Sequence, residues 1–126
     1  MMKLRNLLIL NGIVLVLFAL GMLLLPVTFL DMFGFGTNDP AKLLGQIVGV
    51  ELLANGLLSL FAMDNQDQGT RRALTLSFFI ADGIGFFVAL GGVISGTLNA
   101  WGWVLVLAYL LLTLGFGYFQ FLRPDD

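Results

Sequence analysis

Long apolar runs separated by short polar segments dominate the hydropathy pattern of this chain. A helix needs about 20 apolar residues to cross a hydrocarbon core of ~30 Å. Four stretches of that length lie between charges and turn-forming residues, at 7–25, 41–63, 73–93 and 100–122. Asp39 and Pro40 before the second run are typical of a helix start, and Pro26 ends the first run. The pattern predicts an all-α protein, an integral membrane four-helix bundle in which residues 1–126 form a single transmembrane domain.

Positive charges lie mostly on one side of the predicted bundle. Of the six basic residues, only Lys42 falls on the side opposite the termini. Because cytoplasmic loops carry an excess of Lys and Arg, this bias predicts cytoplasmic N and C termini in a multi-pass protein of the cell's inner (plasma) membrane. Lys3 and Arg5 before an apolar run also fit a secretory signal peptide. The first run is longer than the roughly 7 to 15 apolar residues of such a peptide, however, and no A-x-A-like site follows it.

Two acidic residues, Glu51 and Asp82, interrupt the second and third predicted spans. A charge at the centre of a span costs about 2.5 to 3.5 kcal/mol on insertion scales, so we expect both acids to face the bundle interior. Asn55 and Asp82 lie at nearly one depth when counted from the turn between these spans, and Glu51 shares a helix face with Asn55. We therefore predict a hairpin that gathers Glu51, Asn55 and Asp82 into one polar cluster near mid-membrane.

Aromatic and small residues flank this predicted cluster. Phe78, Phe79 and Phe86 share a face of the third span with Asp82, and we expect them to form the walls of a binding cleft. Asn11 adds a polar group to the core, nearer the cytoplasm. On the second span, small side chains that allow close helix approach form one stripe: Gly45, Gly49, Gly56 and Ser59. The aromatic, nearly uncharged stretch 27–35 is expected to lie in the membrane interface or to fold over the mouth of the bundle.

The composition argues against several classes of function. The chain is 59% hydrophobic and 11% charged with a net charge of −2, which is unlike a nucleic-acid-binding protein. It has no cysteine and no histidine, so thiolate chemistry, the usual haem and zinc ligands and the commonest general base are missing. We therefore expect no metal site, no cofactor and no nucleic acid partner.

Several functions remain compatible with the acids. No cationic residue lies in the interior of a span, since Lys42 is at the end of the second one. We therefore expect at least one of Glu51 and Asp82 to be a neutral carboxylic acid that joins helices or contacts a ligand. We favour a non-catalytic protein, either an accessory subunit of a larger membrane complex or a binder of a lipophilic small molecule or lipid. One alternative is an acid–base enzyme of isomerase or cyclase type that acts on a lipid-like substrate, for which the sequence does not identify the catalytic residues. The other is a proton-coupled transporter formed by a homo-oligomer. A glycine stripe facing lipid would favour the subunit, whereas an enclosed cavity touching both acids would favour binding or catalysis.

Three groups of membrane proteins share features with this chain. Its length and span count resemble those of the small multidrug resistance transporters, although Asn11 lies in the span where those proteins carry their essential glutamate. Its acids, Glu51 and Asp82, are similar to the acidic residues of four-helix sterol isomerases and sigma-receptor-like proteins, without the isomerases' histidine and tryptophan patterns. In hydropathy the whole chain resembles short bacterial four-span proteins of unknown function, including the DoxX-like proteins, and this resemblance implies a four-span membrane fold.

Overall fold

The computed structural model describes residues 3–122, and within that range the chain is helical, without strands. Helices make up 82% of the structure. The elements are α1 (Leu4–Leu24), α2 (Pro26–Met32), α3 (Asp39–Phe61), α4 (Gln68–Ile94) and α5 (Gly102–Gly117), which continues as a π-helical segment, Tyr118–Leu122. In this described range α1, α3, α4 and the continued α5 are each long and apolar enough to cross a membrane. The prediction of four membrane-spanning helices is confirmed to that extent.

Polar side chains set the starts of two of these helices. Asn38, rather than Asp39, caps α3, because its Oδ1 accepts a hydrogen bond from the backbone N–H of Ala41 at 2.8 Å. Asp67 caps α4 in the same way by accepting from the N–H of Thr70 at 2.9 Å. Helix α4 therefore begins more than one turn before the apolar run from which its span was predicted.

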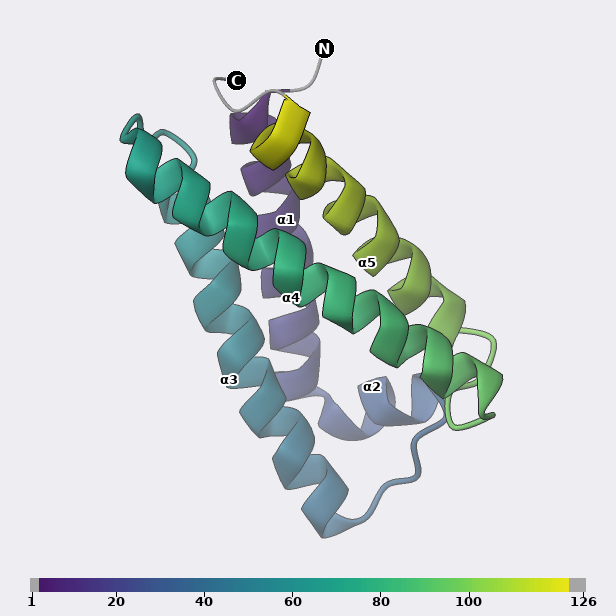
Figure 1. Cartoon of the computed structure of the whole chain (residues 1–126). Helices are drawn as coiled ribbons and strands as arrows, with labels where there is room; N and C mark the ends of the chain where they lie inside the picture. The colour runs from purple at the N-terminus through teal and green to yellow at the C-terminus, as the bar shows by residue number, and fades with distance from the viewer. Residues whose placement is uncertain (1–2, 123–126) are drawn as a thin grey trace.

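The long helices pack as two pairs, α1 with α3 and α4 with α5 (Figure 1). In this view α4 crosses in front of α1 and α3, and the start of α1 lies at the same end of the bundle as the end of α5. The short helix α2 lies at the opposite end, between the two pairs. At the end where α1 starts, residues of α1, α4 and α5 form an apolar core: Leu4, Leu7, Leu8, Leu74, Phe78, Leu112, Phe116 and Phe119.

Small residues bring α1 and α3 together. A Cβ atom added at Gly56 would lie 3.1 Å from the backbone oxygen of Gly12, and one added at Gly12 would lie 3.0 Å from the oxygen of Gly56. Close by, the Ser59 hydroxyl donates to the backbone oxygen of Leu8 at 2.7 Å and accepts from Asn11 Nδ2 at 3.2 Å. The predicted small-residue stripe of α3 is therefore buried against α1 instead of facing lipid.

The predicted hairpin packing of the second span on the third is not formed. Helix α4 packs on α5, because Gly85 leaves room for the ring of Tyr109, whose Cε1 would lie 2.5 Å from an added Cβ. Helix α3 turns its glycines toward α1, so consecutive spans α3 and α4 belong to different pairs. The faces of α3 and α4 that were predicted to pack on each other therefore pack on α1 and α5 or are left exposed.

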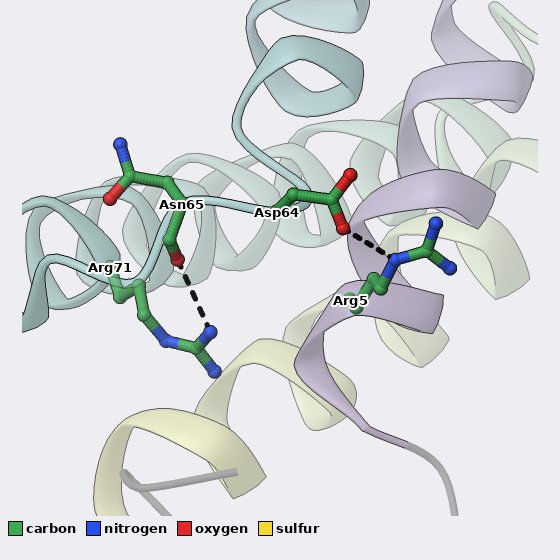
Figure 2. Close-up of polar contacts among 4 residues, drawn as sticks. All are labelled: Arg5, Asp64, Asn65 and Arg71. Atoms are coloured by element: carbon green, nitrogen blue, oxygen red, sulfur yellow. Dashed lines mark hydrogen bonds and ion pairs between the residues drawn. The ribbon is translucent and has the colours of Figure 1, made fainter.

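Polar contacts hold the turn between α3 and α4 against its neighbours (Figure 2). Arg5, in the first turn of α1, forms an exposed ion pair with Asp64 of this turn, with Nε and Oδ1 2.7 Å apart. Arg71, which is buried, donates from Nη1 to the backbone oxygen of Asn65 at 3.4 Å. One turn further along α4, the Thr75 hydroxyl donates to Gln120 Oε1 at 2.6 Å. These contacts join the start of α1 to the α3–α4 turn and the start of α4 to the continuation of α5. They lie at the end of the bundle that carries most of the basic residues.

At the opposite end, Asn99 joins the two outer connections. Its side chain donates from Nδ2 to the backbone oxygen of Met32 at 2.8 Å, and its backbone N–H donates to the oxygen of Phe33 at 3.1 Å. Gly34, which follows, has φ +88°, a left-handed conformation that favours glycine. Asn99 thus fixes the end of α2 against the segment that leads into α5.

Candidate ligand-binding cavity

A cavity of about 190 Å³ lies between the two helix pairs and is covered by α2. All five helices contribute to its lining, and thirteen of its fifteen lining residues are apolar. The two exceptions are Asp82 from α4 and Tyr109 from α5. An apolar cavity of roughly 150 Å³ is large enough to bind benzene. This cavity therefore has room for one aromatic ring or a short acyl segment with a small substituent.

Asp82 gives the cavity its polar contact. The residue is only 8% exposed, and its Oδ2 atom is buried without a hydrogen-bond partner among residues 3–122. Tyr109 lies beside it, within electrostatic range of the carboxyl group, with its ring seated on Gly85 one turn along α4. Leaving a buried polar atom without a partner costs about 1 to 3 kcal/mol. A ligand that donates a hydrogen bond to this oxygen would recover that cost.

Three of the four phenylalanines that line the cavity contact one another. Phe18 of α1 packs edge-on against Phe29 of α2 at a centroid distance of 5.8 Å. Phe33, just after α2, lies 6.3 Å from Phe18 and 6.5 Å from Phe29. Gly21 leaves space for the Phe29 ring, which a Cβ there would overlap. Four residues of stretch 27–35 line the cavity, as expected if this stretch folds over the mouth of the bundle: Phe29, Leu30, Phe33 and Phe35.

Of the residues predicted to form the site, Asp82 alone lines this cavity. Glu51 and Asn55 lie on an exposed face of α3, so the predicted cluster of these two residues with Asp82 is not formed. The physical reason is the orientation of α3: its small residues pack on α1, and the adjoining face with Glu51 and Asn55 is left outward. Asn11 is buried between α1 and α3, where its amide pairs with Ser59.

The predicted aromatic walls also lie elsewhere. Phe78 belongs to the apolar core at the start of α1 and stacks on Phe116 at 5.0 Å. Phe79 packs edge-on against Phe121 at 5.3 Å, near the end of the π-helical segment. Phe86 contacts its neighbour on α4 rather than the cavity. Phe78 and Phe79 therefore join α4 to α5 and its continuation, whereas the ring contact of Phe86 stays within α4.

The sequence pattern did not identify Tyr109, Phe18, Phe29 or Phe33 as site residues. A signal for Tyr109 was present, since it is a tyrosine in the middle of the fourth span, away from the membrane interface where tyrosines gather. Comparison with protein-family models, curated proteins and solved structures gave no match.

Proposed function

We propose that this chain is a multi-pass protein of the cell's inner membrane, with cytoplasmic termini, that binds a lipophilic molecule in the α2-covered cavity. The observation that carries the proposal is the Oδ2 atom of Asp82, which is buried and has no hydrogen-bond partner among residues 3–122. This atom lies in the wall of a cavity whose lining is apolar apart from Asp82 and Tyr109. An acid within a membrane span is costly and by default marks a functional site. The positive-inside distribution of Lys and Arg supports the orientation.

The chain provides an internal comparison for a purely structural polar group. Asn11 is 1% exposed, and its Nδ2 donates to Ser59, which in turn donates to the backbone of α1. Although Asn11 Oδ1 has no partner in the described range, the amide still joins two helices. Asp82 makes no such bond to another helix within residues 3–122, and it lies at a cavity. Its surroundings support ligand contact over structural glue.

Volume and chemistry define the class of ligand. About 190 Å³ accommodates a ring-sized apolar group, and aromatic walls favour a flat one. The Asp82 carboxyl oxygen accepts a hydrogen bond, so the ligand carries a hydroxyl or amine donor next to that group. A lipophilic phenol or a comparable ring with a single donor satisfies both conditions.

The other predicted functions have less support. An acid–base mechanism that uses both acids needs Glu51 at the cavity, and Glu51 is on the outer face of α3. The accessory-subunit hypothesis expected glycines that face lipid, whereas Gly45, Gly49 and Gly56 are buried against α1 and its surroundings. The transporter hypothesis gains no specific observation from the described helices.

Native mass spectrometry of protein released from lipid nanodiscs tests the proposal. Ala108 lines the cavity, so Ala108→Phe fills it, whereas Leu107→Phe places the same ring on an exposed face of α5 as a matched control. We expect the wild type and Leu107→Phe to carry a small-molecule adduct that Ala108→Phe lacks and Asp82→Leu binds more weakly. An adduct that survives in Ala108→Phe, or a wild-type protein without any adduct, contradicts the proposal.

A further inference from the structure

The outward face of α3 carries a heptad pattern. Five residues follow the alternating four- and three-residue spacing of a coiled-coil seam: Leu44, Val48, Glu51, Asn55 and Leu58. In heptad notation Val48 and Asn55 are a positions, and the other three are d positions. All five are exposed on the described chain, with Leu44 at 63%. This surface, the α3 seam, is separate from the small-residue stripe that packs on α1.

Two polar side chains lie at the centre of the α3 seam. The side chains of Glu51 and Asn55 make neither a hydrogen bond nor an ion pair with any residue between 3 and 122. Both lie well inside a helix that is long and apolar enough to span the membrane. A carboxyl group facing acyl chains is penalised by a few kcal/mol, of order 2.5 to 3.5 for a charge at mid-span. A partner helix with polar groups at the same depth would remove this penalty by forming hydrogen bonds with Glu51 and Asn55.

We propose that a second copy of this chain covers the α3 seam in a parallel, two-fold symmetric dimer. Copies inserted with one orientation place their α3 helices parallel, and a two-fold axis then sets each a or d residue against its own counterpart. An amide is both donor and acceptor, so Asn55 pairs with Asn55 of the second copy. A Glu51 carboxyl group that carries its proton can donate it to the carboxyl group of the other Glu51 in the same way.

The apolar residues of the α3 seam also favour a dimer with a second copy of the chain. A β-branched residue at a with leucine at d favours two strands, and the α3 seam has Val48 at a with Leu44 and Leu58 at d. A single polar asparagine at an a position fixes the register of such a pair. Most transmembrane helix pairs cross at about +20°, as soluble coiled coils do, so the pattern keeps its meaning in a bilayer. The proposal rests on this face of α3, although one of its residues, Val48, also lines the α2-covered cavity.

The absence of cysteine from the chain makes disulfide cross-linking a clean test. Leu44→Cys places a thiol in the seam, and Leu43→Cys places one on the neighbouring residue, which is equally exposed at 59% but points off the seam. In oxidised native membranes we expect a cross-linked dimer of twice the chain mass from Leu44→Cys and at least several-fold less from Leu43→Cys. In the Leu44→Cys chain, Asn55→Leu lowers the association constant roughly 3- to 16-fold, while Glu51→Gln keeps the dimer.

Three results would overturn the proposal. Equal cross-linking at Leu43→Cys and Leu44→Cys shows random collision. A product of different mass at Leu44→Cys shows that another protein covers the seam. Unchanged dimerisation in Asn55→Leu shows that the polar pair has no part in the association.

Discussion

Replacing Ser59 by alanine tests the pairing of α1 with α3 through one hydroxyl group. In the folded protein this hydroxyl donates to the oxygen of Leu8 at 2.7 Å and accepts from Asn11 Nδ2 at 3.2 Å. Ser59→Ala removes both bonds and leaves the Asn11 amide, only 1% exposed, without its partner. An orphaned buried polar group costs about 1 to 3 kcal/mol, and inter-helix hydrogen bonds in membranes average about 0.6 kcal/mol. We expect Ser59→Ala to lower the free energy of unfolding by about 1 to 2 kcal/mol.

A double-mutant cycle separates this bond from general packing. When both partners become apolar, no group is left orphaned, so we expect Asn11→Leu with Ser59→Ala to lose clearly less stability than the two single changes summed. Unfolding in mixed micelles with increasing denaturing detergent measures each free energy. Additive effects, or a Ser59→Ala change below about 0.3 kcal/mol, would refute the pairing of these two side chains.

Three further outcomes follow from local structure. Gly56→Ala puts a Cβ 2.9 Å from the Val16 side chain and 3.1 Å from backbone, so we expect a loss of about 1 to 3 kcal/mol on unfolding, whereas Gly91→Ala, with nothing within 4 Å, loses none. Hydrogen bonds from Thr70 lower the pKa of the Asp67 carboxyl group below its usual 3.8. The Asp67 carboxylate therefore stabilises the fold above pH 3.8, and this stabilisation is lost as the pH falls further. Asp67→Asn should remove this pH dependence when unfolding is measured across an acid titration. Arg5→Ala breaks an exposed ion pair and should change the unfolding free energy by less than about 1 kcal/mol.

The span count could be predicted because hydropathy reports helix length directly. The four apolar runs correspond to the four long helices, with differences at starts where a polar cap lies ahead of the run, as Asp67 does for α4. The sequence did not indicate α2 as a helix. Pro26 was predicted to end the first span, whereas the structure has it as the first residue of α2, a position that proline tolerates.

Helix pairing could not be predicted, because it depends on which faces meet in space. The small-residue stripe on α3 was visible in the sequence, but its partner was not, and Gly56 packs on Gly12 of α1 instead of on α4. Because the small-residue stripe of α3 faces α1, Glu51 lies on the exposed side of α3. Asp82 on α4 is instead buried and faces the interior of the bundle. Equal depth along two helices therefore did not bring the acids together, since depth carries no information on direction around each helix axis.

The most direct test of the cavity compares two molecules of nearly the same shape, p-cresol and toluene. Both fit a ring-sized apolar cavity, but only p-cresol donates a hydrogen bond to Asp82, which should tighten its binding roughly 2- to 12-fold. In thermal unfolding of nanodisc-embedded protein, we expect p-cresol to stabilise the wild type and Leu107→Phe more than toluene does, Asp82→Leu to lose that difference, and Ala108→Phe to respond to neither. Equal stabilisation of Ala108→Phe and the wild type by p-cresol would contradict a ligand site at Asp82.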